Sequence, residues 1–108
     1  MQIEKKLVRC ERTKDTGLVV KAIMALNCLD KNKYLDRILI GCDFDGDPKS
    51  PNFIPFDDLT KQEVIDWIVA KKGVEFIEEK EEALLLRVTE RKKEKSTFFD
   101  ELPKKVIN

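Results

Sequence analysis

The feature that most constrains the fold is the shortness of the connections in the N-terminal half of the chain. Three β-like stretches, residues 2–12, 18–29 and 34–42, are separated by only a few residues each. Gly17 ends the first connection and can adopt positive φ, and a polar turn at 30–33 forms the second. Such connections cannot carry a parallel crossover, which needs about a dozen residues or more. The sequence therefore predicts a three-stranded antiparallel β-meander.

The central stretch of this meander, LVVKAIMALNCL at residues 18–29, alternates with the two-residue period of a β-strand. A helix is the competing interpretation because Ala, Met and Leu are good helix formers, but the flanking turns and β-branched residues favour a strand. The apolar face is predicted to contain Leu18, Val20, Ala22, Met24, Leu26 and Cys28. The opposite face mixes apolar residues with Lys21 and Asn27, as expected for an antiparallel sheet that packs on one side. The third stretch is predicted to place Tyr34, Ile38, Ile40 and Cys42 on one face and Leu35 and Leu39 on the other.

Three cysteines, Cys10, Cys28 and Cys42, fall within these β-like stretches. They form no C-x-x-C pair and the chain has no histidine, so they make a poor zinc site. We therefore expect reduced, half-buried side chains that act as small hydrophobic groups.

The second half of the chain contains the clearest local signal. Thr60-Lys61-Gln62-Glu63 has the pattern of a capping box, in which Thr60 and Glu63 satisfy each other's free backbone amides. The pattern predicts a helix over residues 61–72 that ends at Gly73. The residues predicted to point inward are Val64, Trp67, Ile68 and Ala70.

A second helix is predicted over residues 74–95. Its first turns are acidic and its last turns are basic, an order that suits the helix macrodipole. Two glutamates interrupt the basic cluster, which is typical of a solvated helix face rather than a nucleic-acid site. The cluster consists of Arg87, Arg91, Lys92, Lys93 and Lys95. The apolar stripe of this helix is predicted to contain Ile77, Leu84, Leu85 and Val88, with Phe76 and Ala83 beside it.

Together these elements predict an α+β fold: a three-stranded antiparallel β-meander, a helical hairpin and an extended C-terminal tail. Residues 1–96 are expected to form a single domain, with an irregular, proline-rich loop at 43–59. The apolar tail at 97–108 either folds back on the sheet or docks on a neighbouring chain. The predicted partner contacts are Phe98, Phe99, Leu102, Val106 and Ile107 of the tail, with Arg91, Lys92 and Lys95 of the preceding helix.

The run DFDGD at residues 43–47 follows a predicted strand and allows several interpretations. In a phosphotransferase of the haloacid dehalogenase type, Asp43 would be the nucleophile and Asp45 the general acid, but such an enzyme has a doubly wound parallel sheet. An EF-hand loop needs Gly at its sixth position and Glu at its twelfth, whereas this chain has Gly46 at the fourth and Ile54 at the twelfth. Weak cation binding by the three aspartates stays open. The favoured interpretation is a polar turn that closes the strand, so no catalytic, cofactor or metal site is expected.

The balance of charged residues argues against some classes of binding partner. Lys plus Arg and Asp plus Glu each number 21, so the net charge is zero, which argues against general binding of polyanions. The absence of histidine removes the usual acid/base residue near neutral pH and the commonest metal ligand. The N-terminal MQIEKK lacks the apolar stretch of a signal peptide, and no run of residues is apolar enough for a membrane span. We expect an intracellular chain with neither a nucleic-acid nor a membrane partner.

The segment NFIPFDDLTKQEVIDWIVAKKG, residues 52–73, resembles a recurring stretch in a family of short, uncharacterised tailed-bacteriophage proteins. In that family an N-x-x-P-aromatic-x-D-L-T motif opens a helix with a V-I-x-W-V-like core, and an E-R-x-T-x-D-G-like hairpin precedes it. Here ERTKDTG, residues 11–17, occupies the matching place, and the resemblance covers roughly residues 7–90. The charged helix end and the STFFDELP segment depart from the family. The resemblance implies a viral origin and a virion component, with no established activity to carry over.

The expected function is therefore a non-enzymatic structural or adaptor protein of a phage particle, located in the virion or the host cytoplasm. Its expected partners are other copies of itself or other virion proteins. A small intracellular binding module that acts on a host protein is the alternative, and an Asp-dependent phosphotransferase is the remote one.

Overall fold

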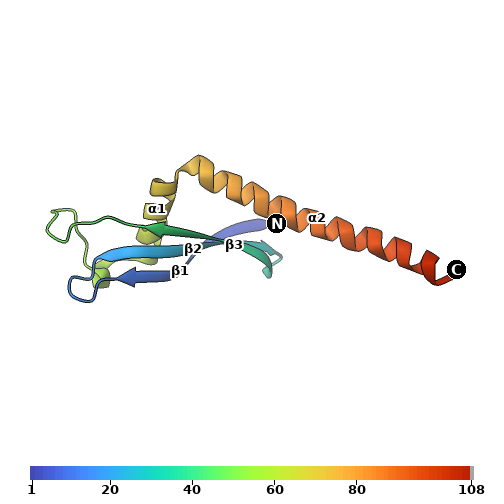
Figure 1. The fold of residues 1–108 in the computed structure, drawn as a ribbon, viewed down its shortest axis with the longest axis horizontal. Helices are drawn as coiled ribbons and strands as arrows, with labels where there is room; N and C mark the ends of the chain where they lie inside the picture. Colours follow the sequence, from blue (N-terminus) through green and yellow to red (C-terminus); the bar gives the residue numbers. More distant parts are fainter. Residues whose placement is uncertain (108) are drawn as a thin grey trace.

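The structure, a computed structural model, describes the backbone of residues 1–107 and the side chains of residues 1–93. Three strands, one short 3-10 helix and two α-helices follow one another along the chain (Figure 1). This architecture confirms the predicted α+β class, with an antiparallel meander followed by two helices. The elements are β1 (Gln2–Arg12), β2 (Val19–Asp30), β3 (Lys33–Asp43), η1 (Phe56–Asp58), α1 (Lys61–Lys72) and α2 (Val74–Ile107).

The sheet is antiparallel throughout, with β2 between β1 and β3. The first turn depends on Gly17, whose φ is 73° and whose amide donates to the Thr13 carbonyl oxygen at 3.0 Å. The second turn places Lys31 and Asn32 at φ 51° and 66°, the positive values of a type I′ hairpin. Both connections therefore have the tight geometry that the sequence predicted.

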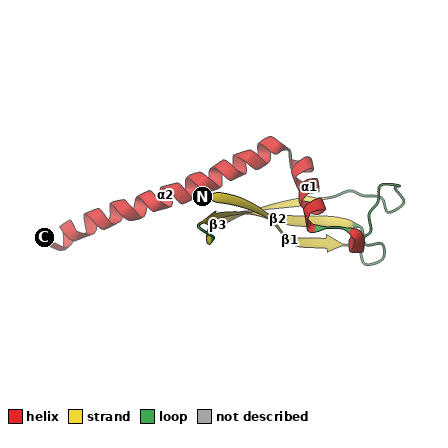
Figure 2. Ribbon diagram, turned by 180° about the vertical axis from the view of Figure 1, so that it is seen from behind, coloured by secondary structure: helices red, strands yellow, loops and turns green. Residues whose placement is uncertain are grey.

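The hydrophobic core lies between one face of the sheet and the two helices, which pack on the same side (Figures 1 and 2). Met24 and Leu26 of β2 are fully buried, as are Ile68 of α1 and Leu84 of α2. Ala22 and Cys28 are buried on the same face, as predicted. Leu18, which precedes the strand, and Val20 were predicted on this face but are only partly buried. The strand interpretation of residues 18–29 is confirmed, and the helical alternative is wrong.

One prediction for β3 is wrong because of a register irregularity. Cys28 pairs with Asp36 and Leu29 pairs with Tyr34, so Leu35 is an extra residue without a partner on β2. An extra residue reverses which side chains face the core. Leu35 therefore packs against the core, and Tyr34 is 51% exposed, the opposite of the predicted arrangement. Ile40 and Cys42 are buried as predicted.

Helix α1 has the predicted bounds and caps. The Thr60 hydroxyl accepts from the Glu63 amide at 3.1 Å, and the Glu63 carboxylate accepts from the Thr60 amide at 3.1 Å, which confirms the capping box. Gly73 ends the helix with φ 95°. Ile65 is buried although it was not among the residues predicted to point inward. Ala70 was predicted to point inward but is exposed.

Helix α2 buries Ile77, Leu84 and Val88 against the sheet, as its apolar stripe predicted. Its bounds run past the predicted end at residue 95 to Ile107, and it continues beyond the end of the sheet (Figure 1). The side chains of Lys95, Phe98, Phe99, Leu102, Val106 and Ile107 lie outside the described residues. Within the described part of the chain, neither helix is both long and apolar enough to cross a membrane.

Candidate functional site

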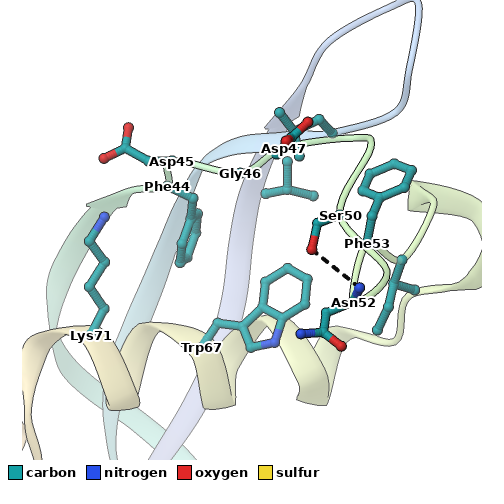
Figure 3. Close-up of a pocket in the computed structure, with 12 residues that line it drawn as sticks. Phe44, Asp45, Gly46, Asp47, Ser50, Asn52, Phe53, Trp67 and Lys71 are labelled. Atoms are coloured by element: carbon teal, nitrogen blue, oxygen red, sulfur yellow. Dashed lines mark hydrogen bonds between the residues drawn. The ribbon is translucent and has the colours of Figure 1, made fainter.

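A pocket of about 420 Å³ lies between α1 and the loop that follows β3, and we call it the aspartate-loop pocket (Figure 3). Phe44 and Phe53 stand at its two ends, with Trp67 of α1 between them. Its polar lining consists of Asp45, Asp47, Ser50, Asn52 and Lys71. Pockets of this size and aromatic content are typical places for a small ligand or an inserted side chain.

The walls of the aspartate-loop pocket are fixed by local packing. The rings of Phe44 and Trp67 meet edge to face, with centroids 5.9 Å apart. The loop approaches β2 so closely at Gly46 that a Cβ there would lie 2.6 Å from the Leu18 Cδ1 atom. The amide of Phe44 also donates to the Val20 carbonyl oxygen at 2.9 Å. The loop is therefore pinned to the sheet on one side and to α1 on the other.

The polar groups of the pocket are mostly engaged within the loop. The Asp47 carboxylate accepts from the backbone amide of Lys49 at 2.9 Å, and the backbone amide of Asn52 donates to the Ser50 hydroxyl at 3.3 Å. The Lys71 ammonium donates to the Asp43 carbonyl oxygen and lies 5.5 Å from the centroid of the Phe44 ring. The pocket thus offers aromatic surface and exposed carboxylates, which suit an apolar or aromatic group that carries a positive charge.

The aspartates that the sequence singled out do not converge. Asp43 is the last residue of β3, and Asp45 and Asp47 are exposed in the loop. Among the described side chains, no group of three or more His, Cys, Asp or Glu is placed to hold a metal ion. The sheet behind them is antiparallel, so it lacks the doubly wound parallel architecture on which the phosphotransferase hypothesis depended. The end of β3 at Asp43 agrees with the predicted strand-closing turn.

The cysteines lie in the strands as predicted, but two of the three are more deeply buried than expected. Cys28 and Cys42 are buried, Cys10 is half-buried, and all three are free thiols. Burial raises the pKa of the Cys10 thiol above its ordinary value. A protonated thiol is a poor nucleophile and metal ligand, so Cys10 acts as a small hydrophobic group. The buried side chains of Cys28 and Cys42 fill the core in the same way.

Charged residues of α2 bind Asp36, near the beginning of β3, across a long sequence separation. Arg87 Nε lies 2.7 Å from the Asp36 carboxylate, and Arg91 binds the same oxygen. Burial alone raises the pKa of Asp36, but hydrogen bonds from the Arg37 amide, Arg87 and Arg91 outweigh it and hold the pKa below its ordinary value. Lys92 pairs with Asp30 at 3.3 Å. Arg91 and Lys92, which the sequence offered as partner contacts, thus already bind carboxylates of their own chain.

The sheet face opposite the helices carries a surface that the sequence analysis left out, and we call it the open face. Its centre is apolar: Leu39 and Gly41 of β3 are exposed and pair with Ala25 and Ile23 of β2. Ile23 is half-buried, and Ala25 is fully buried by side chains of its own chain. Leu39 is 55% exposed, and nothing lies within 4 Å of a Cβ built on Gly41. The basic residues around this centre are Lys6, Arg9, Lys21 and Arg37. Alternation along β2 and β3 could have revealed the face, because both strands continue to place apolar residues on it.

A polar chain crosses one end of the open face. Asn27 Nδ2 donates to the Glu4 carboxylate at 3.4 Å, and Arg37 Nε donates to Asn27 Oδ1 at 3.2 Å. The Arg37 guanidinium also lies 5.6 Å from the centroid of the Tyr34 ring. Asn27 is only 5% exposed, so its amide is held in one orientation between the outer strands. This end of the open face is therefore ordered by contacts within the chain.

Comparison with known families matches residues 2–99 to the family described as Domain of unknown function (DUF7936). The chain belongs to this family. The match includes all three strands, α1 and most of α2, so the pocket and the open face lie within the family domain. Comparison with curated proteins gives no match, and comparison with solved structures gives none either.

Proposed function

We propose that this DUF7936 protein is a non-enzymatic structural or adaptor component of a tailed-bacteriophage particle and that it acts through protein–protein contacts. The observation that carries the proposal is the open face of the sheet. Sheets that face water usually alternate apolar residues toward the core with polar residues toward solvent. Here the outward positions Ile23, Ala25 and Leu39 are apolar in adjoining strands. Leu39 is 55% exposed and Ile23 is half-buried, whereas Ala25 is covered by side chains of its own chain.

The anatomy of the open face supports a protein partner. An apolar centre inside a charged and polar rim is the arrangement of protein–protein interfaces, in which the rim shields the centre from water. The polar chain through Glu4, Asn27 and Arg37 fixes part of this rim in advance. Pre-ordered side chains lose little conformational entropy on binding.

The C-terminal part of the chain supports a second contact region. Helix α2 continues beyond the sheet, and the segment at 97–108 is rich in apolar residues. Phe99, Leu102 and Val106 recur at spacings of three and then four residues, the period of one helix side. We propose that these residues, with Phe98 and Ile107, contact a neighbouring protein in the particle. The phage origin is supported by the motif resemblance at residues 52–73.

Mass spectrometry of purified particles from a phage that encodes this protein tests the proposal. The protein should be present in fixed stoichiometry to the capsid protein, while an early non-structural phage protein measured in the same sample should be missing. Absence from particles, together with presence in infected cells, would overturn the virion role. Solution mass of the full chain and of a chain without residues 97–108 tests the second contact region, and an identical mass for both would count against it.

The aspartate-loop pocket favours a second function, that of a small binding module that acts on a host protein. Its aromatic walls and exposed carboxylates suit an arginine or lysine side chain of a partner. Trp67 is the only tryptophan in the chain, so its fluorescence reports directly on the pocket. Titration with arginine-containing peptides should shift this emission, and the shift should weaken in Phe53→Ala. An emission that no basic or neutral peptide changes would remove this candidate.

A further inference from the structure

The zero net charge of the chain hides a separation of charge between two opposite surfaces. The side of α2 that faces away from the sheet carries exposed glutamates from the start of the helix. The first basic residue on this side is Lys93. Among them lies Leu86, which is 61% exposed. We call this surface the outer stripe of α2. It consists of Glu75, Glu79, Glu82, Leu86 and Glu90, which recur every three or four residues and therefore share one helix side.

The open face has the complementary pattern. Its apolar centre around Leu39 and Gly41 is bordered by the basic residues Lys6, Arg9, Lys21 and Arg37. The acidic residues of this face, Glu4, Glu11 and Asp43, lie toward its two ends. Glu11 pairs with Arg9 at 2.9 Å, so the basic residues of the rim exceed the acidic ones by a single charge. A partner that fits this surface has an apolar residue at its centre and carboxylates around it. The outer stripe of α2 is such a surface, and it lies on the opposite side of the same molecule.

We propose that copies of this protein associate head to tail, with the outer stripe of α2 in one copy packed on the open face of the next. The inference rests on the proposed function in protein–protein contacts, but it does not depend on the phage origin. The proposed contact is a packing of α2 on the sheet, like the one in the core, where Leu84 and Val88 of α2 pack on the other face of the sheet. The space over Gly41 receives the Leu86 side chain of the neighbour, and the glutamates face the basic rim.

The dimensions of the two surfaces agree. At about 1.5 Å per residue, the stretch from Glu75 to Glu90 is roughly 22 Å long. At about 3.3 Å per residue, the stretch of β2 from Lys21 to Asn27 is roughly 20 Å long. One helix on three strands buries less than the roughly 1,600 Å² of a standard interface, so each contact is weak alone. A head-to-tail contact leaves one open face and one outer stripe free at the ends, and it therefore generates rings or filaments.

Two single substitutions and their mixture test this arrangement. Leu39→Asp blocks the open face, and Leu86→Asp blocks the outer stripe. Both residues are more than half exposed, so each variant should keep the circular dichroism and melting temperature of the parent. The parent protein should exceed the monomer mass at concentrations on the order of 10–100 μM, and each variant alone should be monomeric. An equimolar mixture should form 1:1 dimers and nothing larger. The Leu39→Asp variant contributes an intact outer stripe and the Leu86→Asp variant an intact open face, and both remaining surfaces are blocked. Lys14→Glu, in the exposed turn at 13–17, is the control and should assemble like the parent.

Each other outcome overturns the proposal in a recognisable way. A parent protein that stays monomeric up to 1 mM would show that the two surfaces do not bind each other at a useful strength. Dissociation by Leu39→Asp but not by Leu86→Asp would indicate that two open faces pair with each other instead. Variants that both assemble like the parent would place the contact elsewhere. None of these results bears on the particle stoichiometry that tests the proposed function.

Discussion

Replacement of Asp36 by Asn should test how α2 is fixed to the sheet. The Asp36 carboxylate accepts hydrogen bonds from Arg87 Nε at 2.7 Å, from the Arg37 amide at 2.8 Å and from Arg91. Its side chain is only 19% exposed, whereas those of Arg87 and Arg91 are about half exposed. The substitution keeps the size of the side chain but removes the charge that both guanidinium groups bind.

The expected cost follows from the exposure of these groups. Exposed ion pairs contribute about 0.2–1 kcal/mol each, because water and salt screen them. Two such pairs on one half-buried carboxylate give an expected loss of about 1–2 kcal/mol in the free energy of unfolding. For a chain of this length, that loss corresponds to a decrease in melting temperature of roughly 5–10 °C.

The pH dependence provides an independent check. In the folded protein the pKa of Asp36 is lowered below its ordinary value, so ionisation of this carboxyl stabilises the folded state relative to the unfolded state. Its contribution is fully present above the unfolded pKa of about 3.9 and is lost as the pH falls through the folded pKa. The difference between parent and Asp36→Asn should therefore be constant from pH 7 to about pH 5 and disappear in more acidic solution.

Urea unfolding followed by circular dichroism at several pH values measures both quantities. Asp30→Asn is the matched control because Asp30 pairs with Lys92 at 3.3 Å and its side chain is 39% exposed. It should cost less than about 0.5 kcal/mol. Equal losses for the two variants, or a loss at Asp36 that persists unchanged to pH 2, would refute the argument that a half-buried carboxylate between two arginines fixes α2.

Three further changes test the core, the cap and the thiols. Leu84→Ala should destabilise the fold by about 2–5 kcal/mol in urea unfolding, because it leaves a cavity in the core, while Leu86→Ala should cost less than about 0.5 kcal/mol. Thr60→Ala should cost about 0.5–2 kcal/mol by the same measurement, because it removes the capping box of α1. A thiol reagent at pH 7.5 should react slowly with Cys10 in the folded protein and quickly in urea, because burial raises the pKa of this thiol. Rapid reaction of the folded protein would contradict this account.

Local patterns were sufficient to predict most elements of the fold. Gly17 and the turn at 30–33 fixed the antiparallel order, and the Thr60 and Glu63 pair fixed the start of α1. These features work because each depends on residues that are close in sequence. The facing of Tyr34 and Leu35 failed because a register irregularity depends on the pairing between strands, which a single strand does not encode.

The functional surfaces were harder to predict because they combine residues far apart in sequence. Asp36 meets Arg87 and Arg91 across more than fifty residues, so Arg91 was predicted to be available for a partner when only its own helix was considered. The aspartate-loop pocket joins Phe53 to Trp67 through loop geometry that the prolines make irregular. The alternation of residues along β2 predicted an outer face of mixed polarity. It did not show that Leu39 and Gly41 of β3 lie beside the apolar residues of that face.

The open face follows from how the helices are connected. A sheet of three strands has two faces, and one helical layer can cover only one of them. Helix α1 packs on the core face, and Gly73 is the single residue that joins it to α2. A connection of this length cannot carry α2 around the edge of the sheet, so α2 must begin on the side that α1 already covers. The uncovered face is therefore a consequence of the chain topology, and the apolar residues that β2 and β3 place on it are the basis of the proposed contact with another protein.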